Sequence, residues 1–272
     1  MHHAISLGAG VQSSTMALMA SVGEITPMPD FAIFADTQDE PKKVYDWLAY
    51  LTPLLSFPVH TVTAGKLSEA SLTMREARPE YSRTNIPFFT KNSDGSLGMV
   101  QHRSCTKLFK IDPIHRFLKK ECKVGTKSKI NKKRIVQWIG ISIDEFQRAK
   151  ESKNWWLIHR WPLIELRYSR RDCLNWMSEH GYETPPRSAC VFCPYRDNKG
   201  WRSLKRDSPD DFEKAVQFEL ATQKSKEGTG GNDSVPYIHR KRIPLSQVDF
   251  RNDFDKGQLP LWDDECEGMC GV

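Results

Sequence analysis

The sequence lacks the features of a membrane protein and of a secreted disulfide scaffold. It contains no uninterrupted apolar run of the roughly 18 residues that a membrane-spanning helix needs. Its first residues have neither the basic region nor the apolar core of a secretion signal, so we expect a cytoplasmic protein. Seven cysteines in a reducing compartment are more typical of metal binding or thiol chemistry than of disulfides.

Three further patterns are missing. The chain has no internal repeat, which excludes a solenoid. Its first glycine-rich turn follows neither G-x-x-x-x-G-K-[ST] nor G-x-G-x-x-G, the motifs of P-loop hydrolases and dinucleotide-binding dehydrogenases. The single C-x-x-C is not followed by a second one, as it would be in many zinc-binding domains.

Charge is unevenly distributed along the chain. Lysine and arginine outnumber aspartate and glutamate by 40 to 34, which gives a net charge of +6. Much of the excess lies in residues 119–134, and a smaller cluster lies at 239–242. Both segments fit solvated loops, and both also fit a surface for an anionic partner such as tRNA, DNA or a nucleotide substrate.

Apolar runs typical of strands alternate with amphipathic runs typical of helices. The expected strands cover 4–7, 30–36, 58–63 and 134–142, and the expected helices cover 13–22, 41–51, 110–121 and 169–182. This alternation predicts an α/β fold with an open, mostly parallel, twisted sheet and helices on both faces.

The remaining segments are less regular. Residues 67–104 are rich in proline and glycine, and the sequence KNSDGSLG (91–98) predicts a hairpin or flap. From about residue 185 strand patterns cease, and the chain becomes rich in cysteine, proline and charge. We therefore divide the chain into an α/β domain (1–195) and a helical, basic C-terminal region with a cysteine-containing tail (196–272).

The first strand leads into a turn suited to binding phosphate. Residues 5–15 read ISLGAGVQSST, so small residues separate the strand from the next helix. Exposed backbone N–H groups, the helix N-terminus and serine hydroxyls together attract an anion. An ordinary turn that needs glycine for its conformation is the alternative. Asp36, at the end of the second strand, could accept from a ribose hydroxyl or an amino group, or could simply begin the next helix.

Several segments, in this order, resemble the adenine-nucleotide α-hydrolase (PP-loop) superfamily, and in particular its phosphoadenosine-phosphosulfate (PAPS) and adenosine-phosphosulfate (APS) reductases. These segments span residues 4–195: SLGAGVQSS, FADTQDEPKKVYDWLAYL, CTKLFKIDPIHRFL, WIGISIDEFQRAK, WPLIELRYSRRDCLNWMSEHGYETPP and SACVFCPYR. The resemblance implies a Rossmann-like PP-loop fold that binds ATP, PAPS or APS. It implies nucleotide-binding roles for Ser6, Gly8, Gly10, Gln12, Ser13, Ser14 and Asp36.

The same resemblance implies a [4Fe–4S] cluster. Cys105, Cys190 and Cys193 match three of the reductases' cluster ligands, and Cys270 or Cys266 of the tail could supply the fourth. A structural zinc site and unligated thiols remain alternatives, because soft sulfur ligands suit several metals. Cys122 and Cys173 lie in helical patterns and are expected to be structural.

Two departures from the family pattern bear on activity. Gln12 stands where the common PP-loop has aspartate, which makes ATP-pyrophosphatase activity less certain. Ser104 precedes Cys105 where the iron–sulfur reductases have adjacent cysteines.

The resemblance also implies catalytic residues. The tail, DECEGMCGV, offers Cys266 as the family's redox cysteine. The cations expected near an anionic substrate are Arg103, Lys107 and Arg148.

Three functions follow as hypotheses. The first is thiol-dependent reduction of an activated sulfate, with Cys266 as nucleophile and a thiol reductant as partner. The second is ATP-dependent sulfur insertion into tRNA or DNA, with a separate sulfur donor and the basic segments 119–134 and 239–242 as the contact surface. The third is a non-enzymatic nucleotide-binding or zinc-binding adaptor. A homodimer is compatible with each of them.

Overall fold

A central parallel sheet organises the chain. The computed structural model describes residues 1–77, 85–100, 103–124, 135–224 and 234–251. Within these residues the main sheet has five parallel strands in the order β3–β2–β1–β6–β7. These strands are β1 (His2–Ser6), β2 (Phe31–Asp36), β3 (Val59–Thr63), β6 (Ile135–Ile139) and β7 (Leu157–Arg160). The predicted α/β fold is confirmed.

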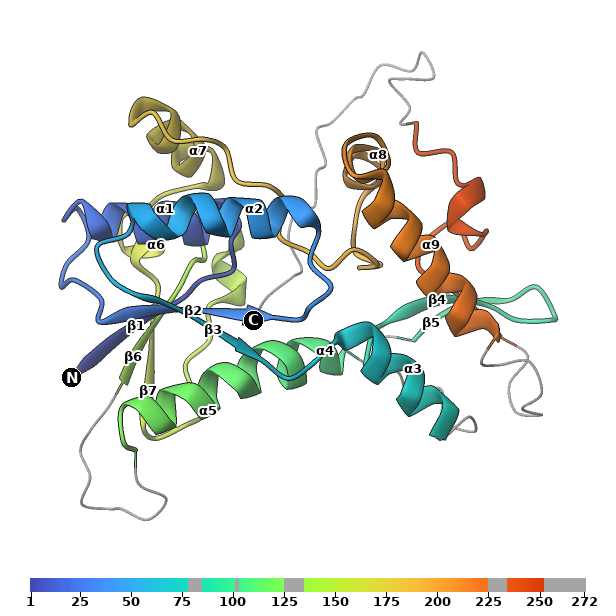
Figure 1. Cartoon of the computed structure of the whole chain (residues 1–272), viewed down its shortest axis with the longest axis horizontal. Helices are drawn as coiled ribbons and strands as arrows, with labels where there is room; N and C mark the ends of the chain where they lie inside the picture. Colours follow the sequence, from blue (N-terminus) through green and yellow to red (C-terminus); the bar gives the residue numbers. More distant parts are fainter. Residues whose placement is uncertain (78–84, 101–102, 125–134, 225–233, 252–272) are drawn as a thin grey trace.

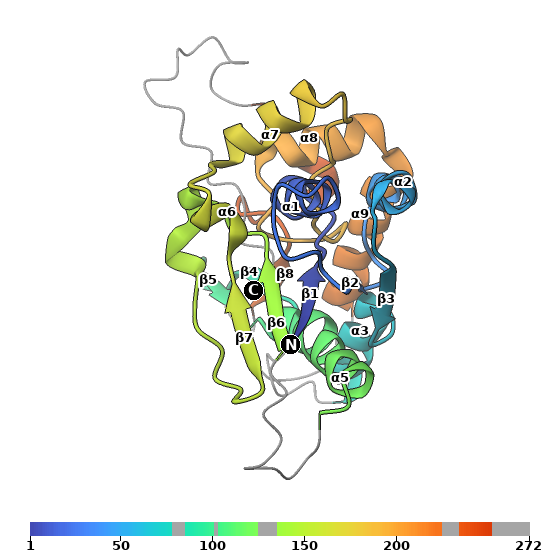
Figure 2. The ribbon, with the colours of Figure 1, turned by 90° about the vertical axis from the view of Figure 1, so that its left-hand side faces the viewer.

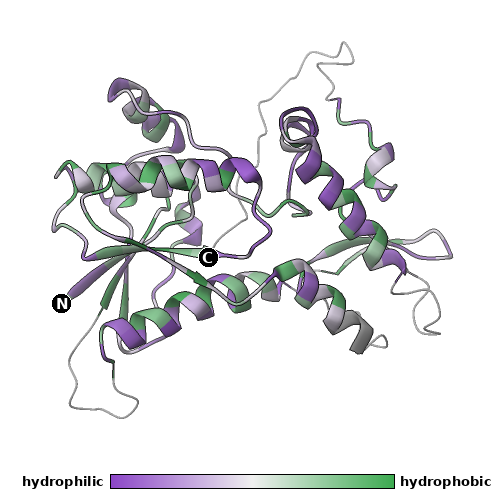
Figure 3. Ribbon diagram, viewed as in Figure 1, coloured by the Kyte–Doolittle hydropathy of each residue, from purple (hydrophilic) through white to green (hydrophobic). Residues whose placement is uncertain are grey.

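Helices cover both faces of this sheet (Figures 1 and 2). One face carries α1 (Val11–Ser21), α2 (Lys42–Leu51), α6 (Pro162–Glu165) and α7 (Arg170–Glu179). The other face carries α5 (Asp112–Glu121), which follows the short α4 (Ser104–Thr106) and a π-helical turn, η2 (Lys107–Ile111). Hydrophobic residues, green in Figure 3, lie on the strands and on the sides of the helices that face them. This is expected of a sheet that is buried on both faces.

Strand order reverses between β1 and β6. The chain runs outward from β1 through β2 to β3, and then returns to the other side of β1 to form β6 and β7. β1 and β6 pair in register from His2↔Ile135 to Ser6↔Ile139. Ligands of open α/β sheets bind outside the carboxyl ends of the strands at such a reversal. The fold therefore places a candidate site after Ser6 and Ile139.

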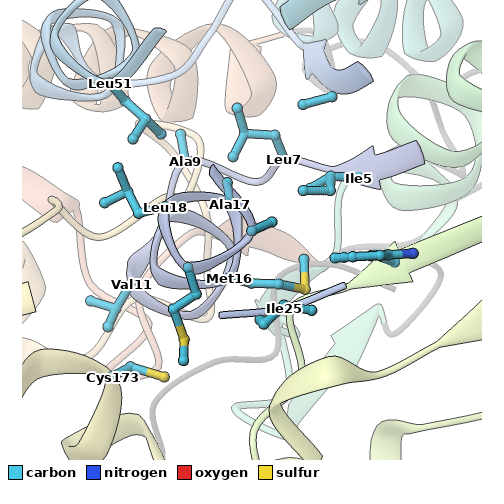
Figure 4. Close-up of a cluster of buried hydrophobic side chains, with 14 of the residues drawn as sticks. Ile5, Leu7, Ala9, Val11, Met16, Ala17, Leu18, Ile25, Leu51 and Cys173 are labelled. Atoms are coloured by element: carbon cyan, nitrogen blue, oxygen red, sulfur yellow. The ribbon is translucent and has the colours of Figure 1, made fainter. Parts of the chain in front are cut away.

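The largest core lies between α1 and the sheet (Figure 4). It includes Ile5, Leu7, Met16, Leu18 and Leu51, each at most 2% exposed. Cys173 also belongs to this core, and burial raises the pKa of its thiol to about 12. Cys122 is buried in the core under α5. The expectation that these two cysteines are structural agrees with their burial.

A second, antiparallel sheet lies beside the first. Its order is β5–β4–β8, with strands β4 (Phe88–Lys91), β5 (Leu97–Val100) and β8 (Val235–Tyr237). It packs with α3 (Leu67–Ala77), α8 (Asn198–Asp207) and α9 (Pro209–Lys224), the elements on the right of Figure 1. This core combines segments from before and after residue 195. The division at that residue stays a prediction.

Some local predictions from the sequence agree with the structure, and others do not. The hairpin predicted around 91–98 is confirmed by the pairing of β4 with β5. Ser169 caps α7, in a capping box with Asp172. Helix α3 was not anticipated, because its segment was assigned to an irregular region. In the described part of the chain, no helix is long and apolar enough to cross a membrane.

The basic cluster at 239–242 is partly internal. The guanidinium of Arg242 donates to the carbonyls of Thr90 and Gly98, both at 3.0 Å, and thereby ties the loop to the second sheet. His239 is 2% exposed. Arg240 and Lys241 are exposed, so only part of the predicted cluster faces solvent.

His239 makes this region sensitive to acid. Its Nε2 donates to Asn198 Oδ1 at 3.0 Å, and its Nδ1 accepts from the backbone N–H of Lys241 at 3.2 Å, which requires a neutral ring. Burial, followed by the charges of Arg240 and Lys241, lowers the pKa of His239 from 6.5 to about 4. The unfolded chain therefore binds a proton between these two values while the folded chain does not.

We expect the free energy of unfolding to fall as the pH drops from 6.5 to about 4. The contribution of His239 to this loss is roughly 3 kcal/mol at the lower end. Urea denaturation at several pH values in this window, on the wild type and His239→Gln, measures it. The variant should show a flatter profile, and His2→Gln, at a half-exposed position, should not. An unchanged profile in His239→Gln would contradict this assignment.

Candidate functional site

A cavity of about 510 Å³ lies at the predicted edge of the sheet. Residues from the carboxyl ends of β1 and β6 form one side, and η2 and α5 form another. Five of the seven residues predicted to bind nucleotide line it: Ser6, Gly8, Gly10, Gln12 and Ser13. The structure thus brings most of the first turn to the position where α/β sheets bind ligands.

The turn between β1 and α1 is organised around one serine. The backbone N–H of Gly8 donates to Ser13 Oγ at 3.1 Å, and Ser13 Oγ lies 3.3 Å from the carbonyl of Gly10. Gly10 is the N-cap of α1, no side chain among the described residues caps the helix, and the first turn contains no acidic residue. The helix N-terminus therefore presents unpaired N–H groups and partial positive charge to the cavity.

The loop after β6 approaches this turn closely. A Cβ added at Gly140 would lie 2.8 Å from both N and Cα of Ser13. Gly140 also lines the cavity. Glycine is thus required at position 140, because a side chain there would push β6 away from the start of α1.

Cationic side chains surround the cavity. Arg148, Arg170 and Arg187 line it, together with Lys150 and Lys153. Arg148 Nη1 lies 2.6 Å from Glu145 Oε1, in the short helix η3 (Ile143–Arg148). This arrangement favours an anionic ligand.

Gln12 is held between a cation and an anion. Its Oε1 accepts from Arg170 Nη1 at 3.3 Å, and its Nε2 donates to Glu145 Oε2 at 3.4 Å. A neutral amide can bridge the two groups because it has both a donor and an acceptor. Arg170 was not anticipated, since its position at the start of α7 resembled an ordinary helix terminus.

Three predicted residues lie outside the cavity lining. Ser14 is fully buried, and its Oγ accepts from the indole Nε1 of Trp47 at 2.9 Å, because the helix turns its side chain toward α2. Asp36 accepts from the backbone N–H of Gln38 and from Tyr45 Oη, at 2.7 and 2.8 Å. Lys107 pairs with Asp112 at 2.7 Å on the exposed side of η2. Each of these three side chains contacts other groups of the chain, and their predicted roles at the site stay predictions.

A second, smaller cavity brings the predicted thiols together. Cys105, Cys190 and Cys193 all line this space of about 40 Å³. Arg103 lies beside it, with its guanidinium 5.3 Å from the centre of the Tyr195 ring. The 84 residues that separate Cys105 from the C-x-x-C are therefore bridged by the fold, as the resemblance implies.

Backbone hydrogen bonds fix the three cysteines. The N–H of Cys105 donates to the carbonyl of Asn85 at 2.8 Å. The N–H of Cys193 donates to the carbonyl of Cys190 at 3.0 Å, which closes a turn between them. Val191 donates to the carbonyl of Asp39 at 2.8 Å and so anchors that turn to the loop after β2.

The two cavities share part of their walls. Thr106 and Lys110 line both of them. Lys110 Nζ lies 3.2 Å from Glu40 Oε1, and the Glu40 side chain is 1% exposed. Cys190 Sγ lies 3.6 Å from the same carboxylate oxygen, so Lys110 and Glu40 connect the thiol cavity with the larger one.

Glu40 and Lys110 were missed by sequence reasoning. Glu40 precedes Pro41 and α2, a position where acids commonly stabilise the start of a helix. Its Oε2 is buried with no hydrogen-bond partner in the described residues. The sequence shows only an acid just before a proline. It does not show the pairing with Lys110, because 70 residues separate the two.

The smaller cavity offers three sulfur ligands, whereas metal and iron–sulfur sites of this kind usually have four ligands. Thiolates suit iron–sulfur clusters and zinc. Within the described residues, no three His, Cys, Asp or Glu side chains gather closely enough to hold a metal ion. Cys266 and Cys270 lie outside the described residues, as does most of the basic segment 119–134. The three thiols have the donor chemistry for such a group, but their arrangement within the described residues does not by itself form a metal site.

Comparisons with known proteins find similarity in structure but not in sequence. No protein-family model matches the chain, and no curated protein sequence matches it. The chain is similar to a solved structure of PAPS reductase from Candida auris in complex with phosphate, with a TM-score of 0.41 and 14% identity. The match covers 68% of this chain and 75% of that one. At this level it says nothing about the residues of the two cavities.

Exchanging each serine of the first turn separates ligand binding from folding. Ser13→Ala should weaken pyrophosphate binding about tenfold with a small loss of stability, because its hydroxyl organises the turn. Ser14→Ala should leave the affinity unchanged but cost about 1–3 kcal/mol, because the Trp47 indole loses its acceptor. Isothermal titration calorimetry and urea denaturation measure the two effects. Equal losses of affinity in both variants would contradict these assignments.

Gly140→Ala tests the contact between the β6 loop and α1. We expect it to cost about 1–3 kcal/mol and to lower pyrophosphate affinity, because the new Cβ displaces the N-terminus of α1. Gly8→Ala is the matched control for stability, since its Cβ would meet Ser13 Oγ at an ordinary 3.6 Å. Thermal unfolding that is equally affected by both substitutions would rule out the proposed clash.

Proposed function

We propose that this chain binds an adenine nucleotide in the larger cavity and carries out thiol-dependent reduction of an activated sulfate, as PAPS and APS reductases do. One observation carries the proposal. The three cysteines that the sequence pattern selects share a cavity whose walls, Thr106 and Lys110, also line the cavity at the start of α1. An anion site and a thiol site thus lie next to each other.

The nucleotide phosphates are assigned to the N-terminus of α1. Uncapped N–H groups there and the hydroxyl of Ser13 provide donors without bulky side chains. Arg148, Arg170 and Arg187 supply positive charge around the same cavity. Together they offset the several negative charges of a nucleotide with an activated sulfate.

Cys105, Cys190 and Cys193 would hold a [4Fe–4S] cluster, with Cys270 as the fourth ligand. Their soft donors and common cavity suit such a group. A bound cluster would supply a compact local charge and polarisable sulfur beside Lys110. The chain's own contribution is to position Lys110, which Glu40 fixes between the two cavities.

Cys266 is the proposed nucleophile. Its thiolate attacks the sulfur of the sulfo group, and the bond from that sulfur to the phosphate oxygen breaks. This leaves a cysteine S-sulfonate and releases the nucleotide phosphate with the electron pair of the broken bond. A thiol of the reductant then attacks the cysteine sulfur, which forms a disulfide and releases sulfite. Neighbouring cations stabilise the anions at both steps.

Metal content and sulfite release test this function together. Anaerobically purified protein should contain about four iron and four sulfide per chain. Cys105→Ala should lose the iron, and the core variant Cys122→Ala should retain it. The wild type should release sulfite from PAPS or APS with a thiol reductant, and Cys266→Ser should lose this activity while retaining iron. Stoichiometric zinc without iron would contradict the proposal.

ATP-dependent sulfur insertion into tRNA or DNA is the second candidate. Lys150 and Lys153 at the larger cavity, with the exposed Arg240 and Lys241, favour a polyanionic partner. The two tail cysteines could pass sulfur between them. Pyrophosphate release from ATP that depends on added nucleic acid would support this function, whereas sulfite release supports reduction.

A further inference from the structure

A strip of polar side chains crosses the face of the main sheet that α5 covers. β6 is a central strand, and its residues Ile135, Gln137 and Ile139 share this face. Strands buried on both faces are normally apolar throughout. Gln137 is nevertheless only 7% exposed, so its amide is removed from water at a cost that hydrogen bonds must offset.

Only one of the two polar atoms of the Gln137 amide has a hydrogen-bond partner in the described residues. Its Nε2 donates to Ser6 Oγ on β1 at 2.5 Å. Its Oε1 is buried and has no hydrogen-bond partner in the described residues. Gln137 and Ser6 both line the large cavity. A ligand donor in the cavity is the partner that this oxygen lacks.

A second acceptor lies beside Gln137. His159 on β7 is its register partner, so the two side chains share a face of the sheet. His159 Nδ1 lies 2.7 Å from the carbonyl oxygen of Lys150. A carbonyl can only accept, so Nδ1 carries the proton, and Nε2 of the neutral ring is an acceptor. His159 also lines the cavity.

His115 on α5 lies across from this strip. Burial is the main cause that lowers the pKa of His115, and the nearby His159 adds to it. Asp112 opposes this shift, whereas Lys119 and Lys107 reinforce it. The ring is therefore neutral at neutral pH, and it packs edge-on against Trp156 at 5.4 Å between centroids. His115 therefore adds no positive charge to this end of the cavity at neutral pH.

Apolar side chains complete this end of the cavity. Those that line it from β2, β6, α5 and the turn before α5 are Ala35, Ile111, Ile114 and Ile139. Apolar walls with hydrogen-bonding groups at one edge suit a flat heteroaromatic ring. With the Gln137 amide oriented as it is here, and with His159 in its neutral form, Gln137 Oε1 and His159 Nε2 are both acceptors, and they suit a ring that carries an amino group.

We infer that Gln137, with His159, selects the base of the nucleotide by accepting from the exocyclic amino group of a 6-aminopurine. The inference rests on the proposed function, and it assigns the base to the α5 side and the phosphates to the α1 side of one cavity. A 6-oxopurine places a carbonyl oxygen against the same acceptors and is disfavoured by their repulsion.

Binding of AMP, IMP and inorganic pyrophosphate tests the assignment, since AMP and IMP differ at the purine 6-position. Isothermal titration calorimetry of the wild type should show at least ~10-fold preference for AMP over IMP. Gln137→Leu should reduce this preference to within about threefold and leave pyrophosphate affinity unchanged. His159→Phe should also reduce it. Gln247→Leu, which removes an exposed amide away from the cavity, should behave as the wild type.

Folding does not obscure this test. Leucine has a similar volume and removes an unsatisfied buried oxygen, so Gln137→Leu should unfold at the wild-type temperature or above it. A wild-type AMP-to-IMP ratio in both Gln137→Leu and His159→Phe would overturn the inference and leave nucleotide binding intact. A wild type that binds pyrophosphate but neither nucleotide would overturn the proposed function as well.

Discussion

The candidate site depends on one segment, residues 186–196, which crosses the carboxyl edge of the sheet. Ser188 Oγ donates to the carbonyl of Gly8 in the first turn, and Val191 donates to the carbonyl of Asp39 after β2. Arg196, 6% exposed, donates back to the carbonyls of Ala189 and Cys190. These bonds hold the C-x-x-C against the loops that precede α1 and α2. Without them, the thiols and the anion cavity would be independent features of the chain.

Two buried polar groups lie beside the candidate cavities. A mostly apolar sheet and its covering helices provide stability, and Figure 4 shows how densely α1 packs on β1. Against this background, Glu40 and Gln137 each keep one buried oxygen without a hydrogen-bond partner in the described residues. Such groups cost stability, and a ligand, a reacting group or an ordered water molecule can supply the partner that they lack. Both lie beside one of the two cavities, Gln137 in the wall of the larger one and Glu40 next to Cys190 and Lys110.

The fold could be predicted from sequence because strand and helix periodicities are local signals. The first turn and the hairpin around 91–98 were identified in this way. Placement within the site was less predictable. Ser13 and Ser14 are adjacent, yet one lines the cavity and the other bonds Trp47, since helical rotation separates them. Gln137 was hidden in an apolar strand, because its importance arises from register with β1 and β7.

The central claim is that a nucleotide and an iron–sulfur cluster occupy adjoining cavities of one fold. Anomalous diffraction at the iron edge, from anaerobically grown crystals with bound AMP and pyrophosphate, tests it most directly. We predict an iron peak between Cys105 and the C-x-x-C, with ligand density in the neighbouring cavity at the start of α1. Iron absent from the thiol cavity, or nucleotide bound elsewhere on the chain, would contradict the account.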